Sequence, residues 1–452
     1  MKKSLFFKLA SLSVLFVLFA MAGMAQTFTF GDLNYQVNPD GVSVTVTGHV
    51  DGLNATGELN IPESVNHEGN DYAVTTIGNS AFLYYFYLTS LTLPNSLTTI
   101  GNSAFAYCSG FTGDLVIPNS VVTIEPSAFF TCYSFNGDLI IGNSVTTIGD
   151  YAFNSCDGLH GVLNIPSSVE SIGTLVFRYC NFSGITVDPA NSVFDSRDNC
   201  NAIIRTSTNE LITGCVNSFI PNTVTAIDEN AFCGLALTSI DIPNSVITIG
   251  AGAFSFCFDL TGDLTIPNSV QTIGSGAFFQ CSGFDGTLTI GSGVTYIGDE
   301  AFRKCSHFSN AVSLATTPAE LGFEYAGMAF NEFGCQVLTV PFGCAAAYQN
   351  SAWYDPIGLN GFYEFIEAEP QAVSEVENVI SAVYPNPTKG MVRIEAENIK
   401  NVSVYNSLGQ IIFENAANGD AFEYDFSNHQ AGIYFIKVET EKGVETKKIT
   451  VL

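Results

Sequence analysis

Basic side chains are scarce in this sequence, and long stretches have none. The 452 residues include 15 Lys and Arg against 43 Asp and Glu, which gives a formal net charge of −28. Between Lys8 and Arg178 there is no Lys or Arg at all. A surface of this kind repels phosphate backbones, so the charge excludes nucleic acid as a partner. Cationic partners and divalent ions remain compatible with it.

Residues that carry catalysis are also few. Only five histidines are present, and no two of them have the spacing of a metal-binding pair. The motifs of zinc proteases, serine hydrolases and P-loop enzymes are missing. Acidic pairs such as Asp259 with Asp263, or the stacked Asp114 and Asp138, are compatible with calcium but more typical of turns on a solvated surface. We therefore expect no catalytic residue, no cofactor and no metal ion.

Long hydrophobic runs are absent except at the start of the chain. There, two lysines precede an apolar run over residues 9–21, and small residues follow it up to Ala25. This order is typical of a secretory signal peptide. A membrane anchor is the alternative, but the run is short and is interrupted by Ser11 and Ser13. We expect residues 1–25 to be removed on export, which leaves no transmembrane segment in the mature chain.

Repetition is what the chain has in abundance. The stretch "TIGNSAFAYCSGFTGDLVIPNS" at 99–120 returns as "TIGAGAFSFCFDLTGDLTIPNS" at 248–269. The shared unit is L-x-I-P-x-S-V-x-x-I-G-x-x-A-F-x-x-C-x-x-F/L, and its copies follow one another in steps of 24 residues. A fixed period in the twenties is typical of a solenoid, in which one coil cannot bury its apolar face but a stack of coils can.

Each copy also indicates its local structure. In the coil that begins at Leu115, alternation predicts a short strand that Pro118 ends, and Val121 to Ile124 predict a second one. The Ala-Phe-x-x-Cys piece is expected to form a single helical turn, and the glycine after Ile to need a positive φ. Threonines before that Ile should stack as an outward ladder. We expect a mainly β leucine-rich-repeat solenoid of short parallel strands plus single helical turns.

Seven of the twelve cysteines occupy one repeat position, namely Cys108, Cys132, Cys156, Cys180, Cys257, Cys281 and Cys305. Stacking places them in a row with a spacing of about 4.8 Å, and a row cannot surround a zinc ion. We interpret them as small buried hydrophobic side chains, with bridges between neighbouring coils as the alternative.

Two other cysteines bracket a predicted hairpin inserted near 188–217. A register that pairs Ile204 with Leu211 also pairs Cys200 with Cys215, which makes them a candidate disulfide. The alternative is two buried thiols, because a slip of one residue would put them on opposite faces.

Aromatic residues recur one or two positions after the core Phe of each coil: Tyr84, Tyr107, Phe130, Tyr179, Phe256 and Phe279. If the core Phe and Cys point inward, these rings point outward, and a stripe of exposed rings is typical of a contact surface for proteins or glycans. The alternative is that the rings lie flat and seal the outside of the turns.

The "IPNSVxxIGxxAFxxC" units resemble the BspA-like leucine-rich repeats of bacterial surface proteins, a family mostly associated with adhesion and protein binding. Residues 27–54 alternate polar and apolar and resemble the β cap that opens such solenoids. Residues 338–355, "LTVPFGCAAAYQNSAWYD", resemble a closing cap. The resemblance implies a cap at 26–58 and a solenoid with its C-terminal cap at 59–364.

The rest of the chain differs in composition. An acidic linker over 365–380 leads to a segment, 381–452, whose short alternating runs indicate a small antiparallel β-sandwich. This segment resembles the type A sorting domain of the type IX secretion system of Bacteroidota. The matching residues are Tyr384, Pro385, Asn386, Pro387, Gly390, Gly409, Gly432, Tyr434, Lys447, Lys448 and Leu452. The resemblance implies handling by the type IX translocon and its processing protease.

Together these features predict a non-catalytic adhesion or protein-binding protein. It would be secreted or held on the outer-membrane surface of a Gram-negative, Bacteroidota-like cell and would bind extracellular or host proteins. One alternative is a glycan-binding or glycan-processing accessory that uses Asp188, Asp195 and Asp198 at the insertion. The other is a structural surface spacer.

Overall fold

The computed structural model describes residues 26–322, 328–358, 360–368, 380–406 and 411–452. The chain divides into two compact units, Met1–Glu367 and Ala368–Leu452. The expected signal peptide lies outside the described residues, as does most of the expected linker. In the described part of the chain, no helix combines the length and the apolar character that crossing a bilayer requires.

Antiparallel strands open the first unit and continue into a nine-stranded sheet that includes repeat strands. Strand β3 pairs antiparallel with β2 and parallel with β6, and β6 in turn pairs with the first repeat strand. The elements of this region are β1 (Thr27–Phe30), β2 (Leu33–Val37), β3 (Ser43–His49), η1 (Gly52–Asn54), β5 (Ser64–His67) and β6 (Asn70–Ile77). The edge of the repeat array is therefore covered by paired strands, which protects its backbone groups from pairing with another chain.

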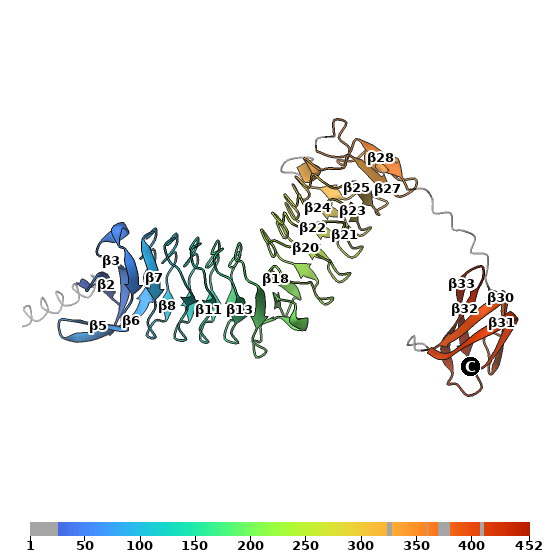
Figure 1. The fold of residues 1–452 in the computed structure, drawn as a ribbon, viewed down its shortest axis with the longest axis horizontal. Helices are drawn as coiled ribbons and strands as arrows, with labels where there is room; N and C mark the ends of the chain where they lie inside the picture. Colours follow the sequence, from blue (N-terminus) through green and yellow to red (C-terminus); the bar gives the residue numbers. More distant parts are fainter. Residues whose placement is uncertain (1–25, 323–327, 359, 369–379, 407–410) are drawn as a thin grey trace, which may run out of the picture. The chain divides into compact units, whose positions relative to one another are not determined.

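The coils that follow stack through two sets of short parallel strands, and their course is visible in Figure 1. In the first half, the Thr-Ile strands are β8 (Thr99–Ile100), β10 (Thr123–Ile124), β12 (Thr147–Ile148) and β14 (Ser171–Ile172). The Leu-x-Ile strands there are β4 (Gly57–Asn60), β7 (Leu88–Thr92), β9 (Leu115–Val116), β11 (Leu139–Ile140), β13 (Val162–Ile165) and β15 (Gly184–Val187).

The second half repeats this arrangement. Its Thr-Ile strands are β19 (Ala226–Ile227), β20 (Thr248–Ile249), β22 (Thr272–Ile273), β24 (Tyr296–Ile297) and β26 (Glu320–Leu321). Its Leu-x-Ile strands are β21 (Leu264–Ile266), β23 (Thr287–Ile290), β25 (Asn310–Ser313), β27 (Val337–Val340) and β28 (Glu364–Glu367). Thr123 lies opposite Thr147, and Thr248 opposite Thr272, so the expected threonine ladder is confirmed.

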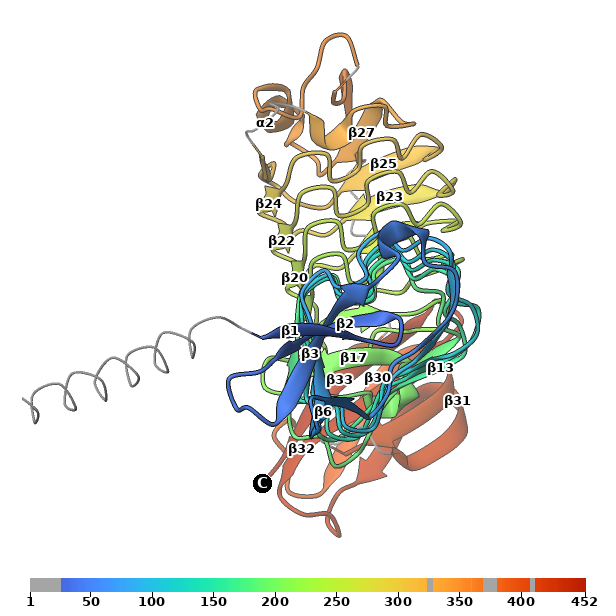
Figure 2. The ribbon, with the colours of Figure 1, turned by 90° about the vertical axis from the view of Figure 1, so that its left-hand side faces the viewer.

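The backbones of the first coils nearly superpose in Figure 2, and their core side chains stack on one another. The Phe129 ring stacks between Phe105 and Phe153, with ring centroids 5.2 and 5.5 Å away. In the second half, Phe278 stacks between Phe254 and Phe302 at 5.1 and 5.4 Å. These side chains are fully buried, so the predicted inward face of the repeat is confirmed.

The expected helical turn after the Thr-Ile strand is wrong. Ser103 and Tyr107 have positive φ angles of 54° and 62°, which no right-handed helix contains. The segment instead forms successive turns, in which Ala104 and Cys108 donate their N–H groups within the coil. The alternate N–H groups of Ser103, Phe105 and Tyr107 donate to carbonyls of the next coil. Bonds between coils therefore hold side-chain-bearing residues in a conformation that glycine usually adopts.

The conserved glycine of the repeat has a different role from the expected one. Gly101 and Gly274 do not have a positive φ. A Cβ atom at Gly101 would lie 2.6 Å from the Ile77 carbonyl oxygen, and one at Gly274 would lie 2.4 Å from the Ala251 nitrogen. Glycine is needed here because the backbones of adjacent coils approach closely.

The seven repeat cysteines are buried free thiols, as expected, but size is not their whole role. Each sulfur donates to the carbonyl oxygen of the core Phe in the preceding coil, at distances such as 3.0 Å from Cys132 to Phe105 and 3.1 Å from Cys156 to Phe129. The Phe105 oxygen also accepts the N–H of Cys108 in its own coil. The thiol therefore supplies a second hydrogen bond to a buried carbonyl and connects two coils.

The insertion separates the two halves. It contains β16 (Phe194–Asp195), η2 (Arg197–Asn199), β17 (Ala202–Arg205) and β18 (Glu210–Gly214). One face of the β17–β18 hairpin packs Ile203 and Ile212 into the first core, and the other packs Ile204 and Leu211 into the second. This two-faced hairpin explains why its sequence is apolar at successive positions.

The candidate disulfide between Cys200 and Cys215 is not formed, since both are free thiols. Ile204 does pair with Leu211, but the register then shifts by one residue, and Ile203 pairs with Thr213. The resulting bulge places Cys200 in the second core and Cys215 in the first.

The solenoid extends further than expected. Strand β28 (Glu364–Glu367) enters the predicted linker and pairs in parallel with β27, with Phe365 packed against the core. The two glutamates of β28 made the segment look like part of an acidic linker, but its residues alternate between exposed and half-buried along a strand. Before it, η3 (Met328–Phe330) and helix α2 (Ala345–Gln349) lie in the closing region. There Tyr348 and Trp353 are buried, and the Trp353 indole donates to the Ala319 carbonyl at 2.8 Å.

The second unit is antiparallel β, as predicted, but it is one five-stranded sheet rather than two stacked sheets. Its strands are β29 (Ile380–Tyr384), β30 (Met391–Tyr405), β31 (Ile411–Asp425), β32 (Gly432–Thr440) and β33 (Val444–Val451). The long β30 pairs with β31 along one edge and with β29 and then β32 along the other. The single long strand β30, which contains register shifts, therefore connects both parts of the sheet, so two separate sheets are not needed.

Thiol reactivity tests the cysteine row. Burial raises the pKa of Cys156 and Cys257 to about 12. At pH 8, a thiol reagent should therefore modify only the half-buried Cys335 and Cys344 in the native protein, and all twelve cysteines after denaturation. Rapid native modification of the repeat thiols, or fewer than about ten thiols after denaturation, would contradict the buried thiol row.

Candidate binding surfaces

The predicted aromatic stripe lies on the side of the solenoid formed by the turns from the conserved glycine to the repeat cysteine, such as residues 101–108. We call this side the turn face. Tyr84, Tyr107, Tyr179 and Phe256 share one repeat position, two residues after the core Phe, and have φ near +60°. Phe130 and Phe279 occupy the position before it. The stripe thus combines two neighbouring columns of side chains.

The first aromatic cluster consists of Tyr84, Phe86, Tyr107 and Phe130. Tyr84 stacks on Tyr107 with ring centroids 4.8 Å apart, and Tyr107 meets the edge of Phe130 at 5.3 Å. Tyr84 is 42% exposed and Phe86 45% exposed. The adjacent Tyr87 is 60% exposed, so this end of the solenoid presents several rings to solvent. The rings are neither isolated nor sealed into the core.

The stripe is not continuous beyond this cluster. In the two coils after that of Tyr107, the equivalent position is occupied by Thr131 and Ser155. Tyr179 in the following coil therefore has no aromatic neighbour in this column. Tyr179 instead lies under the Arg178 guanidinium, whose carbon is 4.5 Å from the ring centroid. Gly234 of the second half approaches the same ring, because a Cβ at Gly234 would lie 2.3 Å from Tyr179. Tyr179 therefore contributes mainly to the junction of the halves.

Phe256 and Phe279 form a second pair, edge to face at 5.3 Å, in the second half. Both are half-buried. The rings reach the surface as expected, but the predicted stripe consists of two separate groups and one junction residue. The signal that separates them was present in the sequence, since Thr131 and Ser155 interrupt the column.

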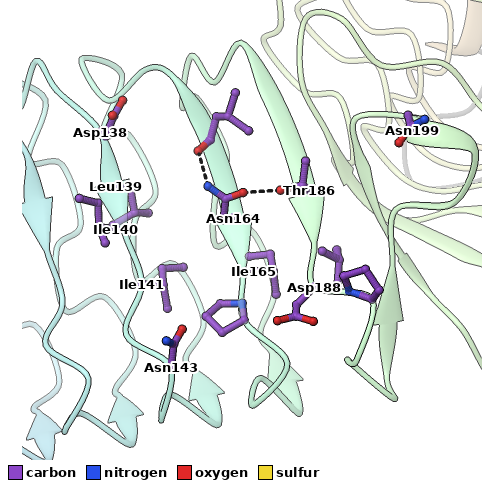
Figure 3. A pocket seen from close by; sticks show the side chains of 14 residues that line it. Asp138, Leu139, Ile140, Ile141, Asn143, Asn164, Ile165, Thr186, Asp188 and Asn199 are labelled. Atoms are coloured by element: carbon purple, nitrogen blue, oxygen red, sulfur yellow. Dashed lines mark hydrogen bonds between the residues drawn. The ribbon is translucent and has the colours of Figure 1, made fainter.

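A groove of about 590 Å³ lies on another side, along the outer surface of β11, β13 and β15 (Figure 3). Ile140 and Val162 line it and are 47% and 49% exposed. Asn164 accepts a hydrogen bond from the Thr186 hydroxyl in the middle of the groove, and Asn199 of the insertion lies at one end. The sequence signal that we missed is an apolar residue at the outward position of Leu-x-Ile, as in Ile140.

The insertion does not gather its three aspartates into one reactive group. Asp188 lines the groove and accepts the N–H of Ala190. Asp195 binds Arg197 through two oxygens, at 2.6 and 2.7 Å. Burial opposes ionisation, but the hydrogen bonds from Arg197 outweigh it and lower the pKa of Asp195. Asp198 lies in η2 with a φ of 58°. A paired, ionised Asp195 is poorly suited to act as a general base.

Carboxylates elsewhere connect coils. Asp114 accepts the N–H of Asp138 at 2.8 Å, and Asp263 accepts the N–H of Thr287 at 2.7 Å. Within the described ranges, no group of three or more His, Cys, Asp or Glu side chains is arranged to hold a metal ion. The acidic turn residues therefore have a structural explanation that requires no calcium.

In the second unit, two of the expected sorting residues, Asn386 and Lys448, meet at the last strand. The Asn386 amide donates to the Lys448 carbonyl at 2.7 Å, and its oxygen accepts the N–H of Thr450 at 2.9 Å. Thr388 forms a bridge with Val451, and the N–H of Leu452 donates to the Thr388 carbonyl. The "YPNPT" segment thus holds the terminal strand in place on its outer edge.

The other expected sorting residues support the same sheet. The Tyr384 hydroxyl donates to Glu395 at 2.6 Å, and the Tyr434 hydroxyl donates to the Gln430 carbonyl at 2.9 Å. Gly390 lies against Ser427, and Lys447 pairs with Glu445. Pro385 and Pro387 flank Asn386, and Gly432 begins β32. Gly409 lies outside the described residues.

Comparison with known proteins agrees with this architecture. The family model described as BspA type leucine rich repeat region matches residues 75–202 and 212–318 in six copies. The model described as secretion system C-terminal sorting domain matches residues 382–452. The sorting domain implies export to the cell surface or secretion in Bacteroidota. No curated protein matches the chain.

Several solved structures resemble the chain. The pneumococcal vaccine antigen PcpA is 16% identical, with 77% of this chain and 94% of PcpA covered and a TM-score of 0.55. A leucine rich cell surface protein from Faecalibacterium prausnitzii is 26% identical, with coverage of 65% and 96% and a TM-score of 0.43. A leucine-rich repeat protein from Bacteroides ovatus is 19% identical, with coverage of 76% and 100% and a TM-score of 0.40. The repeat model matches more than half of the chain. The chain therefore belongs to the BspA-type leucine-rich-repeat family, and it carries a type IX sorting domain.

Proposed function

We propose that the chain is a non-catalytic binding protein that acts outside the cell. The observation that carries this proposal is the first aromatic cluster, in which stacked and exposed rings lie on a rigid array of coils. Large, stiff aromatic side chains contribute most of the energy in many protein interfaces. The partner is an extracellular protein of a host or of a neighbouring cell.

The charge of the first half supports a selective role for these rings. Residues 26–177 contain 13 acidic residues and no Lys or Arg, so the surface around the cluster has one sign of charge. Basic partners are attracted to such a surface, and acidic ones are repelled. The rings then provide short-range contacts once the partner has been attracted.

Glycan binding is the second candidate, and one observation favours it. The groove in Figure 3 combines exposed Ile140 and Val162 with the polar side chains of Asn164, Thr186 and Asp188. This mixture suits the apolar faces and hydroxyl groups of a sugar chain. Asn164→Ala with Asp188→Ala would abolish binding to a glycan array if that role were the correct one.

Replacement of Tyr84 and Tyr107 by Ala tests the protein-binding role. The exported protein should bind at least one immobilised extracellular protein of a panel, and the double variant should lose affinity about tenfold or more because the stacked pair is removed. Tyr151→Ala is the matched control, since Tyr151 is a 39% exposed tyrosine on the same face but outside the cluster. Equal binding by the double variant and the wild type, with unchanged melting temperatures, would overturn the proposal.

The terminal strand tests the export route. Deleting Lys447 to Leu452 should leave the protein in the periplasm with its sorting domain attached, while the solenoid still folds. Asn386→Ala should reduce surface export in the same direction, because it removes two side-chain hydrogen bonds that hold β33. The control is Asn415→Ala at an exposed position on β31. Surface labelling measures the outcome, and normal display of the deleted protein would contradict this route.

A further inference from the structure

Two consecutive coils of the second half lack a side chain at a position that other coils fill. At the repeat position two residues after that of Gly101, the first half carries Ser103, Ser127 and Tyr151, all with φ between 54° and 58°. Gly252 and Gly276 occupy this position at φ 60° and 61°. The backbone path is thus the same, and only the side chain is missing.

A hollow of about 410 Å³ lies where these side chains would be, and we call it the glycine notch. It is lined by residues of four successive coils, from Glu229 to Glu300. Phe256 and Phe279 line it with their rings nearly perpendicular, at an interplanar angle of 86°. The notch therefore offers aromatic surface beside a backbone that a ligand can approach closely.

Carboxylates surround this aromatic surface. Glu229, Asp299 and Glu300 line the notch, whereas none of the described residues that line it is Lys or Arg. Arg303, which lies outside the lining, forms an ion pair with Glu300. Its guanidinium carbon is 5.8 Å from the Phe279 ring centroid. The chain thus already places a cation of its own beside this ring and this carboxylate.

We propose that the glycine notch binds an arginine side chain of a protein partner. An aromatic ring attracts a cation placed over its face, and the carboxylates add charge complementarity. A planar guanidinium stacks on rings and forms forked bonds to carboxylates, so arginine is preferred to lysine. The inference rests on the proposed role as a binding protein, but it uses a site in the other half of the solenoid from the first aromatic cluster.

Gly276→Tyr fills the notch without changing any charge. The substitution has a precedent in this chain, because Tyr151 occupies the same repeat position at nearly the same φ. Space is also available, since the only atom near an added Cβ is the Phe279 Cβ at 3.6 Å. Ser103→Tyr places the same side chain at the same position in the first half and is the matched control.

The probe is a fluorescein-labelled peptide of three Gly-Ser-Arg repeats, measured by fluorescence anisotropy with the mature chain at about 0.15 M salt. Parallel peptides replace arginine by lysine or by citrulline, which has a similar shape but no charge. We expect the arginine peptide to bind more tightly than the lysine peptide, and the citrulline peptide not to bind. Gly276→Tyr should weaken arginine-peptide binding about tenfold, and Ser103→Tyr by less than about twofold.

Three results would overturn the inference: no binding of the arginine peptide to the wild type, equal binding of the citrulline peptide, or unchanged binding by Gly276→Tyr. Non-specific attraction to this acidic protein would give the last result, because the variant keeps every charge. If circular dichroism shows that Gly276→Tyr is unfolded, Phe279→Ala, which also keeps every charge, decides by the same criterion. The Tyr84→Ala, Tyr107→Ala variant should still bind the peptide, which separates this site from the first aromatic cluster.

Discussion

The structure depends on one constraint, which is that every coil must place its backbone in register with the next. A single coil of 24 residues cannot bury its Leu, Ile and Phe side chains, so nearly all of its stabilisation comes from its neighbours. Each parallel strand of a coil is only two to five residues long. The turn face supplies the rest, through backbone bonds such as Phe105 to Ala128 and thiol bonds such as Cys132 to Phe105.

This register explains features that would be unfavourable in isolation. A left-handed conformation costs a residue with a side chain roughly 1–2 kcal/mol, yet Ser103 and Tyr107 adopt it. Their N–H groups bond the next coil, so stacking compensates for the local cost. The close approach at Gly101 has the same origin. Side chains that point away from the stacked backbone, such as Tyr84 and Phe279, can vary without disturbing the register. The missing side chain at Gly276 leaves a notch for the same reason.

The sequence alone predicted the repeat, the buried positions and the type of the second unit, because all of these follow from periodicity. Leu115, Ile124 and Phe129 are inward because the pattern requires it. The turn conformation could not be predicted, since the bonds that stabilise Ser103 come from another coil and leave no local signal. The hairpin register failed for a related reason, because one bulged residue near Ile212 reverses the face of Cys215.

The candidate binding surfaces were predicted less completely than the fold. Outward positions have no periodic requirement, so the sequence identifies rings such as Tyr84 and Phe256 but not which of them meet. The aromatic cluster and the notch became distinct only when their contacts were known. Both depend on the same scaffold, in which the turn face presents side chains at a fixed spacing.

Deletion of one coil tests this dependence most directly. Removing residues 115–138 joins Asp114 to Leu139 and restores the repeat, whereas removing 115–134 leaves the following coils four residues out of step. We expect the first protein to unfold cooperatively with a melting temperature within about 5 °C of the full chain. The second should lose cooperative unfolding in thermal circular dichroism. Similar unfolding of the two proteins would contradict the claim that register between coils holds the structure together.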